Sequence, residues 1–364
     1  MRRAGRDRMR VAFVTPSFAG GGAERVLVNL AAALHNDTCT CHLVALSAEG
    51  PLRARIPEDL DVIDLGVPRI RAALPRLLQT LRRIRPDVIL ASAPHLNVAL
   101  LAARPLLPRG VAVVVREPNL PSLHLRDLPY PAVFRASYRR LYPHADLVIA
   151  SSQRMANEML GFGVPARKVA VVANPVALEQ VRAAAVAPQR EPGDGRRCVA
   201  VGRLVHQKGF DRLVAAMAEL DAADRLRILG DGPLREPLER TARRITDGEQ
   251  VTFAGFVDNP WEWVAGADRL VLPSRTEGMP NVALEALACG TPVIATPQAG
   301  GLAEVRRQAP AGSVEIVPAD RLAEALRRVT PEPVQACRPS RLPATFRAEQ
   351  VEERMRHLLG GLVS

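Results

Sequence analysis

The chain has 364 residues with 48% hydrophobic side chains, which is enough for two domains with well-filled cores. No apolar run approaches the roughly 18 residues of a membrane span. The five cysteines lack the spacing of a zinc site or a disulfide framework, so we expect buried, unreactive thiols in a reducing cytoplasm. The net charge of +11 falls in the first half, because residues 1–186 carry 25 Lys and Arg against 14 Asp and Glu, whereas residues 187–364 carry 24 of each kind. A basic half favours an anionic partner, which can be a membrane surface, a phosphorylated substrate or a nucleic acid.

Short apolar runs alternate with helix-like runs along almost the whole chain, which predicts strands connected by helices. In the first half the strand-like runs are residues 11–15, 40–46, 62–64, 88–91, 111–115, 147–150 and 169–172, with helical stretches at 24–34, 74–84, 132–141 and 154–160. The second half has strand-like runs at 198–201, 225–229, 251–254, 270–272, 293–295 and 314–316, and ends in a helix at 347–359. Between the halves, Pro and Gly cluster in residues 174–197, as in an interdomain linker.

This alternation predicts an α/β fold of two Rossmann-like domains, each a doubly wound parallel sheet, which face a central cleft. We expect the N-terminal domain over residues 1–180, with 1–8 disordered, and the C-terminal domain over 197–343, joined by a linker at 181–196. Residues 344–364 form a C-terminal helix that can return to the N-terminal domain. Open α/β sheets bind ligands at the carboxyl ends of their strands, so polar residues that follow strands are the candidate site residues.

Three loops that follow strands carry residues suited to a phosphorylated ligand. The glycines at 20–22 precede a helix and let a phosphate approach the backbone, although a plain tight turn is the alternative. Arg203 and Lys208 flank the loop after the first strand of the second half, where two cations can neutralise a diphosphate or simply be solvated. Gly230 closes the next strand in a tight turn over residues 230–233, whose free amides can face the same cleft, although a purely structural turn is the alternative.

The segment Glu277–Glu285 lies between two strand-like runs and opens a helix predicted over residues 282–289. Backbone amides at the start of a helix suit an anion, and two carboxylates beside them suit sugar hydroxyl groups. A nucleotide sugar combines both kinds of group. Ordinary surface acids on a solvated helix are the alternative interpretation.

Two strand ends in the first half carry further polar residues, His95 after the run at 88–91 and Arg116 after the run at 111–115. Both are candidate donor or acceptor contacts, although a single loop histidine is commonly unremarkable. Residues 69–85 and 134–142 mix Arg with apolar side chains and could lie on an anionic bilayer. Alternatively, their apolar faces pack on the sheet and the arginines are solvated. Neither stretch has the stacked aromatic residues of a groove for single-stranded nucleic acid.

These motifs together resemble glycosyltransferase family 4, the retaining, nucleotide-sugar-dependent enzymes of the two-Rossmann (GT-B) fold. Four matches occur in the family's order: a Gly-Gly-x-Glu-like loop at residues 21–24, Asn174-Pro175 at the domain junction, Gly202-Arg203 with Gln207-Lys208-Gly209, and Glu277 with Glu285 in the setting Pro273-Ser274 and Gly278-Met279-Pro280. The resemblance covers roughly residues 9–360.

By this resemblance, Glu277 would contact the hydroxyl groups of the donor sugar and Glu285 the ribose. Arg203 and Lys208 would stabilise the departing nucleoside diphosphate, because cations already in place lower the barrier as negative charge develops. The remaining donor contacts implied by the resemblance are made by the backbone. The sugar and diphosphate would be held by the segment of Gly278, Met279, Pro280, Asn281 and Val282. The diphosphate or the transferred sugar would lie against Gly21 and Gly22.

The sequence departs from the family's pattern at one position. Many members place a His after the fifth strand of the first domain, where this chain has Arg116. His95 can contribute instead, or Arg116 can mark a different acceptor or donor. The sequence shows no obvious nucleophile, so we expect a same-face, oxocarbenium-like displacement with retention. The family usually needs no metal, and we expect neither a metal nor a cofactor.

We therefore predict a retaining glycosyltransferase that moves a hexose or N-acetylhexosamine from a nucleotide sugar, preferably UDP-linked, to a lipid-linked or polysaccharide-precursor acceptor. The basic first domain predicts a peripheral location on the cytoplasmic face of the membrane, with no nucleic-acid partner. A GT-B enzyme of another reaction, such as a sugar-nucleotide epimerase or a phosphorylase, is the nearest alternative. A catalytically inactive scaffold and a basic nucleic-acid-binding protein are more remote.

Overall fold

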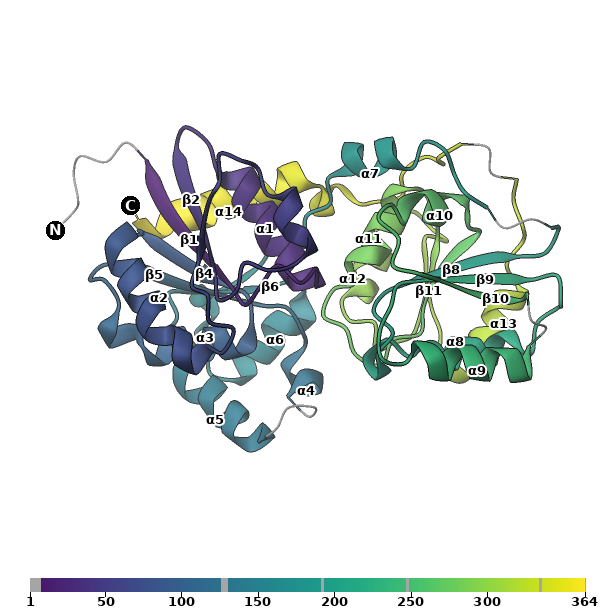
Figure 1. Ribbon diagram of the computed structural model, residues 1–364, viewed down its shortest axis with the longest axis horizontal. Coiled ribbons are helices and arrows are strands. Elements are labelled where there is room, and N and C mark those ends of the chain that lie inside the picture. Colours follow the sequence, from purple (N-terminus) through teal and green to yellow (C-terminus); the bar gives the residue numbers. More distant parts are fainter. Residues whose placement is uncertain (1–7, 126–129, 191–192, 247–248, 334–335, 364) are drawn as a thin grey trace. The chain divides into compact units, whose positions relative to one another are not determined.

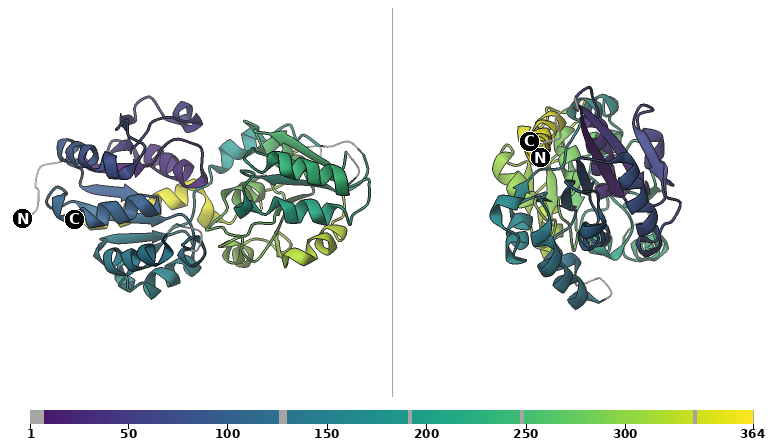
Figure 2. Two further views of the ribbon diagram at one scale, coloured as in Figure 1. Left: turned by 60° about the horizontal axis from the view of Figure 1, so that its bottom comes forward. Right: turned by 90° about the vertical axis from the view of Figure 1, so that its left-hand side faces the viewer.

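The computed structural model describes residues 8–125, 130–190, 193–246, 249–333 and 336–363 (Figure 1). The chain divides into two compact units, the first formed by Met1–Pro175 with Glu349–Ser364 and the second by Val176–Ala348. Each unit is built on its own β-sheet, and helices cover the sheet (Figures 1 and 2). The leader predicted at residues 1–8 lies, apart from Arg8, outside the described residues.

The first sheet has the strand order β3-β2-β1-β4-β5-β6-β7, with every pair parallel. Its strands are β1 (Met9–Thr15), β2 (Cys39–Ala45), β3 (Asp61–Asp64), β4 (Val88–Ala91), β5 (Ala112–Glu117), β6 (Leu147–Ala150) and β7 (Val169–Val171). The helices are α1 (Gly22–Leu34), α2 (Ile70–Ile84), α3 (Pro94–Ala102), α4 (Pro121–His124), α5 (Pro131–Leu141) and α6 (Gln153–Gly161). The strand order reverses at the β1–β4 pair, the switch point at which doubly wound sheets bind ligands.

Two hydrophobic cores lie on opposite faces of this first sheet. On one face α1 and the C-terminal helix α14 (Ala348–Val363) pack with Val11 and Phe13 of β1. On the other face α2, α3 and α5 cover Ala12 and Val14. Successive residues of β1 therefore enter different cores, as the two-residue period of a strand requires. Burial on both faces explains why these strands appear in the sequence as unbroken apolar runs.

The second sheet has the order β10-β9-β8-β11-β12-β13 and is also parallel throughout. Its strands are β8 (Arg197–Val201), β9 (Arg225–Leu229), β10 (Val251–Gly255), β11 (Arg269–Leu272), β12 (Val293–Ala295) and β13 (Val314–Ile316). The helices of this unit are α7 (Leu178–Ala184), α8 (Phe210–Met217), α9 (Arg235–Ile245), α10 (Trp261–Gly266), α11 (Asn281–Ala288), α12 (Leu302–Gln308) and α13 (Leu322–Arg327). Figure 1 shows α8, α9 and α13 on one face of this sheet and α10 and α11 on the other. Its strand order reverses at the β8–β11 pair.

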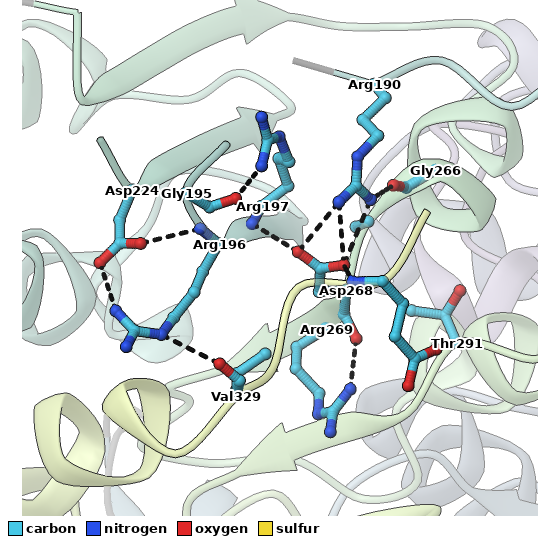
Figure 3. Close-up of polar contacts among 12 residues, drawn as sticks. Arg190, Gly195, Arg196, Arg197, Asp224, Gly266, Asp268, Arg269, Thr291 and Val329 are labelled. Atoms are coloured by element: carbon cyan, nitrogen blue, oxygen red, sulfur yellow. Dashed lines mark hydrogen bonds and ion pairs between the residues drawn. The ribbon is translucent and has the colours of Figure 1, made fainter. Parts of the chain in front are cut away.

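The same hydrogen-bond arrangement recurs at the amino-terminal edges of both sheets. An aspartate just before one strand accepts a hydrogen bond from a backbone amide at the start of the neighbouring strand. The carboxylates accept from backbone amides at 2.7 to 2.9 Å, in the pairs Asp87 with Arg10, Asp146 with Val113, Asp224 with Arg196 and Asp268 with Arg197. Figure 3 shows the last two. The buried Asp268 carboxylate also forms an ion pair with Arg190 at 3.1 Å, which offsets the cost of burying its charge. These carboxylates satisfy amides at the edge opposite the predicted site.

The predicted strands are confirmed, each with ends within two residues of the observed ones. Helix ranges were predicted for α1, α2, α5, α6, α11 and α14, and α2 begins at Ile70 rather than at Leu74. No range was predicted for the remaining helices, which are α3, α4, α7, α8, α9, α10, α12 and α13. The segment expected to be a linker, 181–196, lies inside the second unit and includes the end of α7. Pro175 and Pro188 flank this helix rather than interrupt it, so the cluster of prolines marks the ends of a short element. The division between the units falls between Pro175 and Val176.

Candidate functional site

In the second unit, two motifs that lie 69 residues apart in the sequence meet at one edge of the sheet. Strands β8 and β11 are neighbours, with Val199 opposite Leu270, so the loops that follow them leave the sheet side by side. The first loop ends in the 3₁₀ helix His206–Lys208. The second runs to Asn281, where α11 begins. Both lie at the switch point of this sheet, where the fold favours a ligand.

Hydrogen bonds join these two loops directly. Gln207 Nε2 donates to the carbonyl oxygen of Thr276 at 2.8 Å, and the amide of Arg275 donates to the Gln207 carbonyl at 2.8 Å. Gly209 has a φ of 67°, and a Cβ at this position would lie 2.2 Å from the carbonyl oxygen of Pro273. Glycine is therefore required both by the backbone conformation and by the close approach of the two loops.

Lys208 and Glu277 form an ion pair where the loops meet. Lys208 Nζ lies 2.5 Å from Glu277 Oε1, and the hydroxyl of Ser274 donates to the same oxygen at 3.1 Å. Glu277 is 7% exposed and the Lys208 side chain 23%, so both groups are partly removed from water and their attraction is stronger than on an open surface. An ammonium group has three N–H donors, so Lys208 can bind phosphate oxygens while it holds Glu277.

The second predicted carboxylate, Glu285, lies about one turn into α11 and is buried. Its Oε2 accepts a hydrogen bond from the indole Nε1 of Trp261 at 2.9 Å. Helix α11 starts one residue earlier than predicted, at Asn281, with Pro280 as its N-cap residue. Residues 278–282 thus form the turn into the helix between the two carboxylates, and the Met279 side chain is buried there.

Arg203 and Gly230 follow adjacent strands at the same edge. Arg203 is exposed, as a residue that meets a ligand from solution needs to be. Gly230 has a φ of 133°, and a Cβ there would lie 2.1 Å from the carbonyl oxygen of Gly202, so this glycine serves backbone packing. Its amide donates to the Gly255 carbonyl at 2.7 Å. The Gly230 amide is therefore not one of the free amides expected of this turn, and at Gly230 the structural alternative holds.

In the first unit, the predicted glycines and His95 lie at the β1–β4 switch point. Gly21 is the N-cap residue of α1 and Gly22 its first residue, directly after the loop that follows β1. A Cβ at Gly21 would lie 2.2 Å from Glu24 Oε2, so a larger residue here would displace that carboxylate. His95 lies at the start of α3, after β4. The side chain of His95 is exposed, and desolvation by the neighbouring protein and, secondly, the charge of His124 lower its pKa from the ordinary value.

Arg116, which stands where the family often has His, points into the protein. It is 2% exposed, and its guanidinium donates to Ser92 Oγ at 3.3 Å and to Asn174 Oδ1. Burial lowers the pKa of Arg116 to about 10, so it keeps its charge at neutral pH. The buried guanidinium holds Asn174, the residue before Pro175 at the unit boundary. The predicted contact of Arg116 with a substrate has no support in this arrangement, and the geometry favours a positioning role.

A second buried polar cluster adjoins Arg116 and was not found from the sequence. The Glu117 carboxylate accepts from Tyr138 Oη at 3.0 Å, from Asn97 Nδ2 at 2.9 Å and from Tyr142 Oη. Burial raises the pKa of Glu117 to about 7, although these hydrogen bonds and the charge of Arg116 oppose the shift. Glu117 follows an apolar run like a surface residue at a strand end, and no local pattern indicates its partners 20 to 25 residues away.

Trp261 and Ser274 are also site residues that sequence analysis missed. Ser274 was noted only as part of the Pro-Ser setting, yet its hydroxyl binds Glu277. Trp261 lies 24 residues before Glu285 and reaches it only because α10 packs beside α11. No helix was predicted at Trp261, and the residues around it carry no signal for such a contact.

Solved structures share this two-sheet architecture. Sucrose-phosphate synthase from Thermosynechococcus elongatus has a TM-score of 0.80 at 21% identity, over 98% of this chain and 99% of that one. Anabaena HepE in complex with UDP and glucose has a TM-score of 0.77 at 18% identity, over 97% and 100% of the two chains. These likenesses, with the two parallel sheets, define the fold as GT-B.

Relatives in sequence identify the family. Glycosyltransferase Family 4 matches residues 20–180, and Glycosyl transferases group 1 matches residues 195–330. The lipopolysaccharide core biosynthesis glycosyltransferase LpsE of Rhizobium meliloti (strain 1021) is 31% identical over 287 residues, 77% of each protein. A Campylobacter jejuni N-acetylgalactosamine-N,N'-diacetylbacillosaminyl-diphospho-undecaprenol 4-alpha-N-acetylgalactosaminyltransferase is 26% identical over 302 residues, 79% of this chain and 81% of that one. The chain belongs to glycosyltransferase family 4 and is a glycosyltransferase of the kind that builds lipopolysaccharide and related glycans. These relatives lend no support to the epimerase alternative.

Proposed function

We propose that this glycosyltransferase transfers a hexose or an N-acetylhexosamine, with retention of configuration, from a UDP-linked sugar to a lipid-linked or polysaccharide-precursor acceptor. The observation that carries the proposal is the Lys208–Glu277 ion pair at the carboxyl edge of the second sheet, with Glu285 on the adjoining helix. A cation, a carboxylate beside it and a second carboxylate one helix turn further on are complementary to the diphosphate, the sugar and the ribose of one donor molecule.

In this proposal Lys208 and Arg203 neutralise the negative charge that develops on the leaving diphosphate. Because Glu277 and the 3₁₀ turn already hold the Lys208 side chain, little reorganisation is needed when the sugar–phosphate bond breaks. Glu277 keeps its second oxygen for hydroxyl groups of the sugar. Trp261 fixes the Glu285 carboxylate, whose other oxygen accepts from the ribose.

Retention is proposed to occur on one face of the sugar without a covalent intermediate. Glu277 is engaged by Lys208 and Ser274, an arrangement that suits hydrogen bonding more than nucleophilic attack. The leaving diphosphate would take the proton of the acceptor as the two bonds exchange. We propose that the reaction needs no metal, because two side-chain cations at the site can supply the positive charge.

Known binding partners of similar proteins motivate the choice of donor and acceptor. HepE has been solved with UDP and with UDP-glucose, which supports UDP as the nucleotide. The names of the relatives specify lipopolysaccharide core biosynthesis and an undecaprenol diphosphate-linked acceptor. Both acceptors are attached to lipid, so an enzyme of this kind would work at a membrane surface.

The first unit offers a basic surface for such a membrane. Helices α2 and α5 pack on the same face of the sheet on either side of α3, and both carry exposed arginines: Arg71, Arg76, Arg82, Arg83, Arg135, Arg139 and Arg140. Tyr130 and Val133 at the start of α5 are exposed apolar side chains. Within the described part of the chain, no helix is long and apolar enough to cross a bilayer. We propose peripheral binding to the cytoplasmic face through this surface.

A thermal-shift panel of UDP-, GDP- and ADP-sugars tests the donor. A ligand that binds the folded state stabilises it by about 2.7 kcal/mol at 100 times its Kd, so UDP-sugars should raise the melting temperature and the others should not. Glu277→Gln should reduce the shift, whereas the matched surface variant Glu236→Gln should leave it unchanged. A shift with GDP- or ADP-sugars alone would exclude UDP as the nucleotide.

A flotation assay tests the membrane surface separately. The protein should float with vesicles that contain anionic phosphatidylglycerol at low salt, and less so at high salt. Replacing Arg139 and Arg140 with Glu should reduce flotation, while the same change at Arg327 and Arg328, which are exposed in the second unit, should not. If the wild type fails to float at low salt, the membrane proposal is wrong and the donor proposal stands.

A further inference from the structure

Two cysteine thiols meet at the C-terminal end of α11, although they lie 48 residues apart in the sequence. Cys289 is the C-cap residue of the helix and is fully buried. Cys337 is partly exposed and lies on the segment 336–343, which we call the strap. The Cys337 Sγ lies 3.4 Å from the Cys289 carbonyl oxygen, to which it donates, so the two residues are in direct contact.

The strap is fixed across the end of α11 by several hydrogen bonds. The amide of Arg341 donates to the Leu287 carbonyl at 2.7 Å. The Arg182 guanidinium donates to the carbonyl oxygens of Ala288 and Arg338, at 3.1 and 2.8 Å, and so joins the helix end to the strap. These bonds add partners to the carbonyl groups of Leu287 and Ala288 in the last turn of the helix. The surrounding structure therefore holds Cys337 against Cys289.

Cys337 differs from the other cysteines in accessibility and in charge environment. Cys39, Cys41, Cys198 and Cys289 are buried, as expected from the sequence, whereas Cys337 is partly exposed. A hydrogen bond from the Cys289 thiol, followed by the positive charges of Arg182 and Arg338, lowers the pKa of Cys337 to about 6, although burial opposes the shift. By contrast, burial raises the pKa of Cys198 to about 12. Cys337 is therefore the thiol that a reagent in solution can reach, and Arg182 and Arg338 favour its ionised form, which nucleophilic attack requires.

We propose that Cys337 and Cys289 are a thiol modification site, which a small-molecule disulfide such as glutathione disulfide converts to an intramolecular disulfide. The Cys337 thiolate attacks one sulfur of glutathione disulfide, forms a mixed disulfide and releases one glutathione thiolate. The Cys289 sulfur then attacks Cys337, its proton passes to solvent or to a departing thiolate, and the second glutathione leaves. The protein loses two electrons and two protons, and the oxidant becomes two molecules of glutathione.

The other pair of neighbouring thiols does not compete. The sulfur atoms of Cys39 and Cys41 are 3.7 Å apart on β2, but both side chains are within the hydrophobic core of the first unit. An oxidant in solution therefore cannot reach either of them in the folded protein. A bond between Cys289 and Cys337 would instead close a long loop and restrict the unfolded chain, so oxidation should raise the melting temperature.

The test is to incubate the full-length protein with glutathione disulfide under native conditions and to analyse it by intact mass and non-reducing peptide mapping. We expect a loss of two hydrogen atoms, a cross-link between the peptides of Cys289 and Cys337, and a rise in melting temperature that dithiothreitol reverses. Cys289→Ser should stop at a mixed disulfide on Cys337, and Cys337→Ser should not react. Cys198→Ser, a change at another buried cysteine, should form the cross-link like the wild type.

Three results would overturn the inference: retention of all five thiols by the wild type, a mixed disulfide at Cys337 that never resolves, or a first bond between Cys39 and Cys41. The readouts are mass and melting temperature, which require neither donor nor acceptor. The outcome is therefore independent of the proposed glycosyl transfer.

Discussion

Lys208→Ala removes the cation that lies 2.5 Å from Glu277 and leaves a carboxylate that is 7% exposed without its ion-pair partner. Loss of a hydrogen bond between charged groups lowers the free energy of unfolding by about 1.5–3 kcal/mol, and the partial exposure of Lys208 places the expected loss near the lower end. The effect on catalysis should be larger. A positioned group that stabilises developing charge contributes about 2.7–4 kcal/mol to the barrier, so kcat should fall by about 10² to 10³.

The assay separates these two effects. Release of UDP gives kcat and KM, and isothermal titration gives the donor dissociation constant. Because Lys208 acts on charge that develops as the bond breaks, kcat should fall far more than donor affinity. Lys168→Ala is the matched control, since Lys168 is the chain's other lysine and binds the Pro143 carbonyl in the first unit. A chemical denaturation curve for each variant measures the stability term independently.

The opposite pattern would refute this reasoning. If Lys208→Ala weakens donor binding and kcat/KM equally while kcat is intact, the lysine contributes only ground-state binding. A double-mutant cycle with Glu277→Gln adds a second check, because two groups in direct contact should give strongly non-additive effects. Additive losses would show that the observed ion pair does not matter for the reaction.

Three further predictions concern residues that the sequence did not reveal. Because burial raises the pKa of Glu117 to about 7, from 4.5 in the unfolded chain, the folded state binds more protons between these pH values. The free energy of unfolding should therefore fall by about 3 kcal/mol as pH rises from about 4.5 to 7. Denaturation curves of the Glu117→Gln variant, measured over the same pH range, should not show this fall. Trp261→Phe removes the 2.9 Å bond to Glu285 and should weaken donor binding about fivefold by titration calorimetry; unchanged affinity would contradict the ribose role. Asp268→Ala removes the cap of β8 and the partner of Arg190, and should lower the free energy of unfolding by about 3 kcal/mol, measured in urea; a loss below about 1 kcal/mol would contradict that structural role.

The sequence predicted the fold well because parallel strands buried on both faces appear as continuous apolar runs. Such runs placed the ends of β4, β6 and β9 at the observed residues. It predicted the end of the chain as a helix, but the packing of Val351 and Met355 beside α1 depends on contacts distant in sequence. The linker was misplaced because composition alone cannot distinguish prolines that delimit a helix from prolines that prevent one.

The meeting of Lys208 and Glu277 could be predicted for a similar reason. Lys208 and Glu277 each follow a strand, and the topology of a doubly wound sheet brings the ends of β8 and β11 together. The direction of a buried side chain is not available from such a pattern. Arg116 was therefore expected to face a substrate, whereas the structure turns it inward to Asn174. The Gly230 amide was likewise taken for a ligand contact, although the neighbouring strand uses it.

The most direct test of the central claim is a crystal structure of the complex with an intact UDP-sugar. The account predicts the diphosphate within hydrogen-bond distance of Lys208 Nζ and Arg203, the sugar hydroxyl groups at Glu277 and the ribose at Glu285. A nucleotide bound away from the first turn of α11, or a diphosphate held without Lys208, would contradict it.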